Sequence, residues 1–229
     1  MKINYGSLFV VATPIGNFKD ITLRAIETLQ EVDFIICEDT RTSGNLLKHY
    51  DISNKLISFN AKSESRKIEK VIQEILSGKN CAIISDAGTP TISDPGVRLV
   101  NEALKQGILV SGIPGANAAI LALSISGIPT DSFVFEGFLP QKKGRQKKLK
   151  LLAEESRTIV LYESTYRIEK LLNELSETMP NRFISLSREL TKKFEEVIRG
   201  YPRELVEQID ELNLKGEFVV IIAPLNWKQ

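Results

Sequence analysis

Short apolar runs alternate with segments of helical spacing through the first half of the chain, and no other feature limits the fold as strongly. The runs that we interpret as strands are residues 8–12, 33–37, 81–85 and 108–111. The segments that we interpret as helices are residues 21–30, 63–78, 97–106 and 115–126. Such alternation is typical of a parallel sheet covered by helices on both faces. The sequence therefore predicts an α/β fold, with Asp20 and Ser63 as helix N-caps.

The second half of the chain continues the alternation less regularly. Its predicted strands are residues 132–136, 158–162, 182–186, 195–199 and 217–222, and its predicted helices are residues 168–177 and 203–212. A boundary between residues 115 and 129 divides the chain into two small α/β domains, which we place at residues 1–116 and 117–229.

The composition excludes several classes of protein. With 30 basic and 29 acidic residues the net charge is +1, so contact with nucleic acid requires a local basic patch. Cys37 and Cys81 lie in apolar runs and are expected to be reduced core residues of a cytoplasmic protein. A single histidine, His49, and no Cys/His cluster predict no metal site. We find no signal peptide or membrane span and expect no membrane partner.

The loop of residues 85–96 follows a predicted central strand and is the best candidate for a binding site. Ligands of open α/β sheets bind beyond the carboxyl ends of the strands. The loop is longer than a plain connection needs, and it contains two carboxylates, Asp86 and Asp94. We expect Asp94 to be a helix N-cap, with Pro95 as the first helical residue, and Asp86 to contact a ligand.

Three other strand ends carry weaker signals. The turn at residues 12–17 has no G-x-G-x-x-G pattern, the chain has no P-loop, and a plain tight turn is the preferred interpretation. Residues 37–42 either bind a polar substrate or form a local ion pair. Residues 113–119 open a helix of small residues, which fits an anion at the helix N-terminus, close helix–sheet packing, or both.

Basic residues gather in one segment of this nearly neutral chain. Six of them lie within nine positions: Lys142, Lys143, Arg145, Lys147, Lys148 and Lys150. This density favours binding to RNA phosphates over the alternative, a solvated start of a helix. A second charged segment, Arg188 to Lys192, either anchors a phosphate or forms an ion-pair network.

Taken in order, these segments resemble one branch of the tetrapyrrole methylase superfamily, the branch that methylates small-subunit ribosomal RNA. The resemblance runs from about residue 8 to residue 223. One difference is Pro-Gly-Ala-Asn-Ala at residues 114–118, where Pro-Gly-Pro-Ser-Ala is more usual. The motifs that carry the resemblance are residues 11–17, 20–22, 38–42, 85–90, 93–96, 114–115, 136–140, 162–163 and 188–192.

The resemblance implies an S-adenosylmethionine-dependent enzyme that methylates the ribose 2′-hydroxyl of a cytidine in the decoding region of 16S rRNA. The implied substrate form is the assembled 30S subunit. It also implies a homodimer of two-domain chains, with an N-terminal parallel sheet, a C-terminal mixed sheet and the cofactor in the cleft between the domains. By motif position the cofactor-binding residues are Pro14, Asp86, Ala87, Gly88, Thr89, Pro90, Ser93, Pro114, Gly115, Ala116 and Tyr162.

Transfer to a ribose hydroxyl needs a proton acceptor, and we expect Glu38 or Asp39 in that role. The candidates for RNA contact are Arg41, Lys142, Lys143, Arg145, Lys147 and Lys148. Two alternatives remain open. One is methylation of a tetrapyrrole of the precorrin type by the same fold, and the other is a non-enzymatic RNA-binding or ribosome-assembly module.

Overall fold

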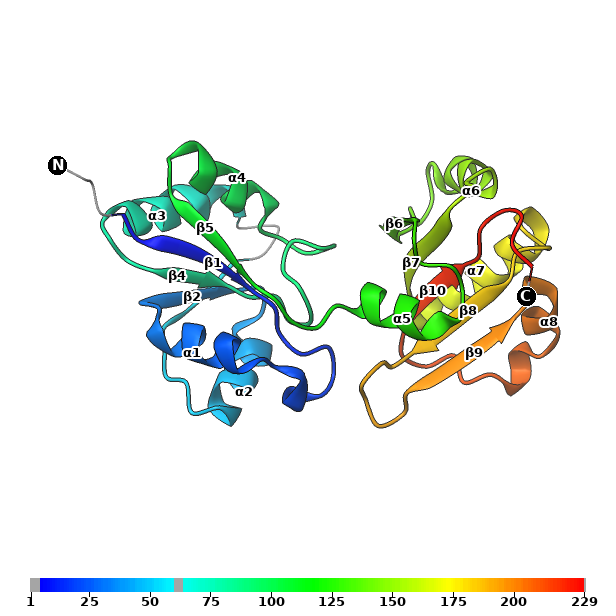
Figure 1. Ribbon diagram of the computed structural model, residues 1–229, viewed down its shortest axis with the longest axis horizontal. Coiled ribbons are helices and arrows are strands. Elements are labelled where there is room, and N and C mark those ends of the chain that lie inside the picture. The colour runs from blue at the N-terminus through cyan, green and yellow to red at the C-terminus, as the bar shows by residue number, and fades with distance from the viewer. Residues whose placement is uncertain (1–4, 60–63, 229) are drawn as a thin grey trace. The chain divides into compact units, whose positions relative to one another are not determined.

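The computed structural model describes residues 5–59 and 64–228. Its contacts group the chain into two compact units, Met1–Asn117 and Ala118–Gln229 (Figure 1). Each unit is a five-stranded sheet with helices packed against it, which confirms the predicted α/β fold class. That the units are domains with a boundary after residue 116 stays a prediction.

The sheet of the first unit is entirely parallel, as predicted. Strand β4 pairs with β1 on one side and with β2 on the other, so Cys81 lies between Leu8 and Phe34. In sheet order the strands are β3 (Leu56–Ser58), β2 (Phe34–Cys37), β4 (Cys81–Ile83), β1 (Ser7–Val11) and β5 (Leu109–Ile113).

Helices cover both faces of this sheet. Helices α3 (Glu64–Leu76) and α4 (Val97–Lys105) lie on one face, and α1 (Leu23–Glu31) and α2 (Thr40–His49) lie on the other (Figure 1). Successive residues of β2 alternate between the two cores because strand side chains alternate in direction. Phe34 and Ile36 join the core under α3 and α4, whereas Ile35 and Cys37 join the core under α1 and α2.

The helix starts differ from the predicted caps. Thr22, not Asp20, caps α1, because its hydroxyl accepts a hydrogen bond from the backbone N–H of Ala25 at 3.1 Å. Helix α4 begins at Val97 after Gly96, so the prediction of Asp94 as its cap and Pro95 as its first residue was wrong. The predicted cap Ser63 lies outside the described residues.

The sequence interpretation also missed helix α2 and the short strand β3. Helix α2 buries only Ser43, Leu46 and Leu47, so its apolar periodicity is weak. Its clearest sequence signal is Asp39, which caps the helix by accepting a hydrogen bond from the N–H of Arg41 at 2.8 Å. The sequence interpretation places that residue in a charged strand end.

The sheet of the second unit is mixed, as predicted. Strand β6 pairs parallel with β7, and the other three pairings are antiparallel. In sheet order the strands are β6 (Phe133–Phe138), β7 (Thr158–Ser164), β10 (Glu217–Ile222), β8 (Ile184–Arg188) and β9 (Glu196–Gly200).

One apolar core fills the space between this sheet and three helices, α6 (Arg145–Ala153), α7 (Thr165–Thr178) and α8 (Pro202–Glu207). The remaining helix, α5 (Ala118–Ser126), packs against β10, β7 and β8. Its small residues Ala119 and Ala122 are buried there, so close helix–sheet packing explains the composition of this helix.

Both cysteines are free and buried in the first unit. Within the described ranges, none of the helices combines the length and the apolar character that a bilayer-crossing segment requires.

Candidate functional site

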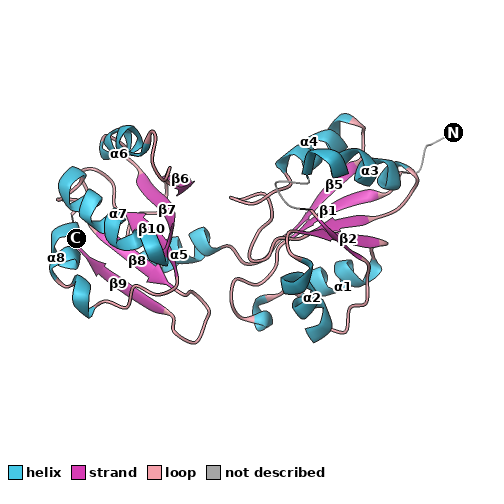
Figure 2. Ribbon diagram, turned by 180° about the vertical axis from the view of Figure 1, so that it is seen from behind, coloured by secondary structure: helices cyan, strands magenta, loops and turns pink. Residues whose placement is uncertain are grey.

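The loops that follow β1, β4 and β5 leave the first sheet at one edge, because parallel strands end on the same side (Figure 2). Thr13 and Gly88 link two of these loops through reciprocal backbone hydrogen bonds of 2.9 and 3.1 Å. The Thr13 hydroxyl donates to the carbonyl of Ser85 at 3.1 Å. The Thr89 hydroxyl donates to the carbonyl of Ala116 at 3.1 Å, which adds the loop after β5. The three segments therefore form one connected surface.

The backbone of the loop at residues 85–96 takes unusual conformations. Thr91 and Ser93 have φ values of 74° and 65°, a region that residues other than glycine rarely adopt. Each such residue costs on the order of 1 kcal/mol and persists only where its surroundings hold it, most often at functional sites. The φ of 123° at Gly96 lies outside the helical region, which explains why the helix cannot begin at Pro95 with Asp94 as its cap.

Glycine is required where these loops approach one another. A Cβ on Gly115 would lie 2.9 Å from the Cβ of Ala12, closer than side chains pack. Gly88 has a φ of 80° and lies under Ile15, which a Cβ would approach at 3.2 Å. Backbone atoms of residues 88 and 115 thus remain close to the sheet edge, where a side chain would otherwise intervene.

Carboxylates line a hollow of about 390 Å³ at the same edge. Its walls come from the turn after β2, the start of α2, β3 and the loop after β4, and the residues are Glu38, Asp39, Thr40, Ser58 and Asp86. The backbone N–H of Asp39 donates to a carboxylate oxygen of Asp86 at 3.1 Å, which ties the two strand ends together. The structure therefore brings together Glu38, Asp39 and Asp86, three of the residues that the sequence singled out.

The carboxyl groups of this edge differ in proton affinity. Hydrogen bonds from Arg41 lower the pKa of Asp39 to about 2. Burial, followed by the charges of Asp86 and Asp39, raises the pKa of Glu38. Burial, followed by the charges of Glu38 and Asp86, raises the pKa of Asp94 to about 6. Neighbouring carboxylates thus contribute to the raised pKa values of Glu38 and Asp94, and the edge suits a cationic ligand.

Arg41 lies beside this hollow, with its side chain 89% exposed. Its guanidinium contacts both carboxylate oxygens of Asp39, at 3.1 and 2.6 Å. The local ion pair that the sequence left open is therefore present. The exposed guanidinium also keeps surface for a phosphate.

The predicted RNA-binding residues of the second unit do not share one environment. Lys142, Lys143 and Lys147 are exposed. Lys148 is partly exposed and forms an ion pair of 2.6 Å with Glu136.

Arg145 departs from the prediction, because it is only 2% exposed and has no surface for RNA. Its guanidinium contacts Glu174, with Nε at 2.8 Å and Nη2 at 2.7 Å from Oε2, and it lies 3.7 Å from Glu163. A buried guanidinium needs such partners. Arg145 therefore has a structural role between α6 and α7. Leu149, one turn further along α6, is also buried, and this i,i+4 spacing is the signal that the basic run conceals.

The segment from Arg188 to Lys192 is an ion-pair network, one of the two interpretations left open. Arg188 is buried and contacts Glu196 at 3.0 Å. Lys192 contacts both Glu189 and Glu217 at 2.9 Å. These cations are already neutralised by protein carboxylates.

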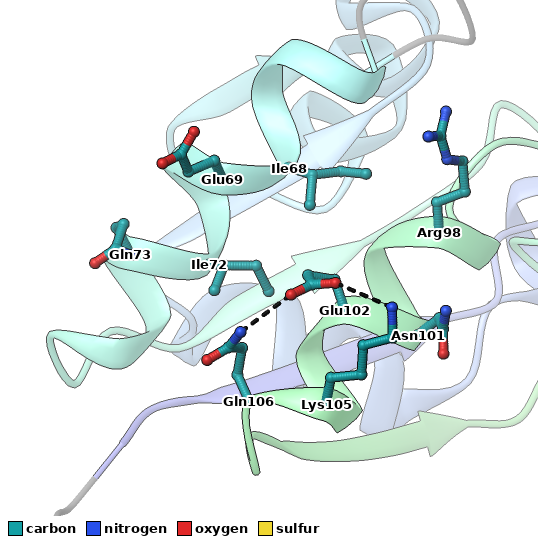
Figure 3. Close-up of a pocket in the computed structure, with 9 residues that line it drawn as sticks. All are labelled: Ile68, Glu69, Ile72, Gln73, Arg98, Asn101, Glu102, Lys105 and Gln106. Carbon is teal, nitrogen blue, oxygen red and sulfur yellow. Dashed lines mark hydrogen bonds and ion pairs between the residues drawn. The ribbon is translucent and has the colours of Figure 1, made fainter.

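Another hollow of the first unit, of about 510 Å³, lies between α3 and α4 (Figure 3). Glu102 accepts a hydrogen bond from Gln106 at 3.0 Å and lies 3.5 Å from Lys105, so its charge is satisfied by its own helix. The lining residues belong to these two helices and to Gln106, which directly follows α4, and none comes from the strand ends. We do not include this hollow in the candidate site.

Comparison with known proteins assigns the class. The family model of Tetrapyrrole (Corrin/Porphyrin) Methylases matches residues 7–206. A uroporphyrin-III C-methyltransferase from Thermus thermophilus, solved with S-adenosyl homocysteine, has a similar fold with a TM-score of 0.65 at 16% identity; 96% of this chain and 98% of that one are covered. The chain belongs to the tetrapyrrole methylase family, which confirms the resemblance and the predicted fold.

Within this family the chain is homologous to the proteins named ribosomal RNA small subunit methyltransferase I. The protein of that name from Halalkalibacterium halodurans is 47% identical over 95% of this chain and 75% of its own length. The protein of that name from Thermotoga maritima is 42% identical over 95% of this chain and 98% of its own length.

The raised pKa of Asp94 predicts a pH-dependent stability. The folded chain retains a proton up to about pH 6 that the unfolded chain loses near pH 3.8, so ionisation of Asp94 lowers the free energy of unfolding as the pH rises between these values. Because Asp94 is partly exposed, we expect Asp94→Asn to stabilise the protein by only about 1 kcal/mol at pH 7 and by almost nothing near pH 4.

Urea unfolding of the wild type and the variant across this pH range measures the difference. Asp131→Asn removes the same charge at an exposed position and is the control. A gain in Asp94→Asn that is the same at every pH would contradict the assignment.

Proposed function

We propose that the protein transfers the methyl group of S-adenosylmethionine to the ribose 2′-hydroxyl of a cytidine in the decoding region of small-subunit ribosomal RNA. The observation that carries the proposal is 47% identity, over 95% of this chain, to a ribosomal RNA small subunit methyltransferase I. The connected loops at the carboxyl edge of the first sheet supply a site of suitable chemistry. The resemblance further leads us to propose the 30S subunit as substrate and a cytoplasmic homodimer as the active form.

The residues of the sheet edge fit the proposed donor. The donor supplies a methyl group that is already activated by a sulfonium charge, so the protein has mainly to bind and orient it. Asp86 and Asp94 offer negative charge, and the pKa of Asp94 is raised by its burial and then by the charges of Glu38 and Asp86. The similar uroporphyrin-III C-methyltransferase was solved with the demethylated donor product.

Backbone groups of the loops would make the remaining contacts to the donor. Gly88 and Gly115 keep side chains away from the loop backbone, as their close approach to Ile15 and Ala12 shows. We therefore assign donor contact to the segments around these glycines. The residues of this assignment in the first unit are Pro14, Asp86, Ala87, Gly88, Thr89, Pro90, Ser93, Pro114, Gly115 and Ala116. The resemblance adds Tyr162 of the second unit.

Glu38 suits the role of proton acceptor better than Asp39. Both oxygens of Asp39 bind Arg41, and its pKa of about 2 makes it a weak base. The carboxyl group of Glu38 has a raised pKa, and it lines the hollow beside Asp86. A carboxylate with a raised pKa is a stronger base and accepts a hydroxyl proton more readily.

Methyl transfer from labelled S-adenosylmethionine tests the proposed function directly. We expect label in 16S rRNA when the protein is incubated with unmethylated 30S subunits, and digestion to nucleosides should give 2′-O-methylcytidine. Label in a precorrin but not in RNA would establish the tetrapyrrole alternative. Failure to bind the donor in calorimetry would favour the non-enzymatic RNA-binding alternative.

Replacement of the proposed base should slow the transfer. We expect Glu38→Gln to lower kcat by roughly 100-fold, the usual contribution of a general base, with donor affinity changed less than about threefold. The wild-type rate should rise with pH through the raised pKa of Glu38, and Glu38→Gln should lose this rise.

Asp39→Asn is the matched control for Glu38→Gln. It removes the neighbouring charge but keeps a side-chain oxygen that can cap α2, because Asn and Asp are similar N-caps, so it should retain most of the activity. Equal losses in the two variants would argue against Glu38 as the base.

The exposed lysines should determine the salt dependence of RNA binding. Neutralised phosphates release counterions, and each contact to a single strand adds about 0.7 to the slope of log K against log salt. Replacing Lys142, Lys143 and Lys147 with Ala should therefore flatten that slope by roughly 2. Fluorescence anisotropy with labelled RNA at several salt concentrations measures it.

Lys148→Ala is the control for this series, because Lys148 already pairs with Glu136 and should change the slope less. Donor affinity should not change in the triple variant. Parallel loss of donor and RNA affinity would show that the segment supports the fold instead.

A further inference from the structure

Phe138, the last residue of β6, is 52% exposed and presents an aromatic ring to solvent. The guanidinium carbon of Arg167 lies 5.6 Å from the centre of this ring. The ring of Tyr162 lies 5.7 Å away in an edge-to-face arrangement. Tyr166, beside Arg167 at the start of α7, is 95% exposed. Single exposed aromatic residues are common, but this one belongs to an ordered group.

Buried charges hold this group in place. Glu163 is 1% exposed, and one of its oxygens lies 2.7 Å from Nη2 of Arg167. Arg167 also donates to the carbonyl of Leu139 at 3.4 Å, directly after Phe138. The other oxygen of Glu163 lies 3.7 Å from Arg145. The guanidinium of Arg167 is thus fixed against the ring from within the second unit.

The exposed lysines follow this group closely along the chain. Lys142 and Lys143 lie four and five residues after Phe138, in the segment that leads from β6 into α6 (Figure 1). An exposed aromatic ring with a guanidinium, next to cations that neutralise phosphates, is the arrangement with which proteins bind single-stranded nucleic acid. Bases stack on such rings only when they have left the duplex stack.

We propose that Phe138, supported by Arg167, is a stacking platform for an unpaired base of the RNA. The inference rests on the proposed function, because it takes RNA as the substrate. The inference adds a basis for substrate selection, because the platform gives looped or single-stranded RNA a higher affinity than duplex RNA. The lysines alone offer no such selection, since both forms carry phosphates.

The test compares the binding of single-stranded and duplex RNA of one sequence, with 2-aminopurine at the centre of the single strand. Phe138→Ala should weaken single-strand binding about tenfold and abolish the quenching of 2-aminopurine, because stacking on an aromatic ring is lost. Duplex binding and the salt slope should stay as in the wild type, since no phosphate contact is removed. Phe138→Trp should restore both the affinity and the quenching.

Phe133→Ala is the matched control, since Phe133 is the first residue of the same strand and is 37% exposed. It should leave the binding of both RNAs unchanged. Equal weakening of single-strand and duplex binding in Phe138→Ala would overturn the inference. So would a loss of S-adenosylmethionine affinity, which would assign the ring to the donor.

The inference and the proposed function fail in distinguishable ways. If the wild type neither binds RNA nor labels 30S subunits, the proposed function fails. If the wild type does both and Phe138→Ala keeps its preference for single strands, only the platform is wrong.

Discussion

The paired backbone hydrogen bonds between Thr13 and Gly88 are the interaction on which the candidate site depends. They join the loop after β1 to the loop after β4, and the Thr89 hydroxyl extends the connection to Ala116 after β5. Without them, a loop with left-handed Thr91 and Ser93 would have little to hold it, because those conformations are unfavourable by themselves. The site is therefore mainly backbone, ordered by its neighbours, and its side chains add charge.

Charge is distributed differently in the two units. At the sheet edge of the first unit, burial and then neighbouring carboxylates raise the pKa values of Glu38 and Asp94, as expected for a surface that binds a cation. In the second unit the buried carboxylates Glu163 and Glu174 are paired with guanidinium groups. The carboxylates of the first unit remain available to a ligand. Those of the second unit hold α6 and α7 together and position Arg167 beside Phe138.

Apolar periodicity predicted most of the fold because burial imposes it. The alternating faces of β2 and the small residues of α5 follow directly from which side chains must be covered. Helix α2 was missed because it buries few residues. The predicted cap Asp20 was wrong because the nearby Thr22 satisfies the same polar pattern. The predicted cap Asp94 was wrong because α4 begins after Gly96, which has no capping side chain. The backbone conformation decides at which residue a helix begins, and residue type is a weak guide to that conformation.

The sequence by itself determined the α/β class, the family and the set of polar residues at the strand ends, because these depend on local order along the chain. Only the tertiary structure decided their roles. Arg145 looks like its lysine neighbours in the sequence, yet it turns inward to Glu174, because α7 packs there. Asp39 and Glu38 are adjacent, yet Arg41 neutralises one while burial raises the pKa of the other. Such differences arise from contacts and burial in three dimensions, which residue type and spacing do not specify.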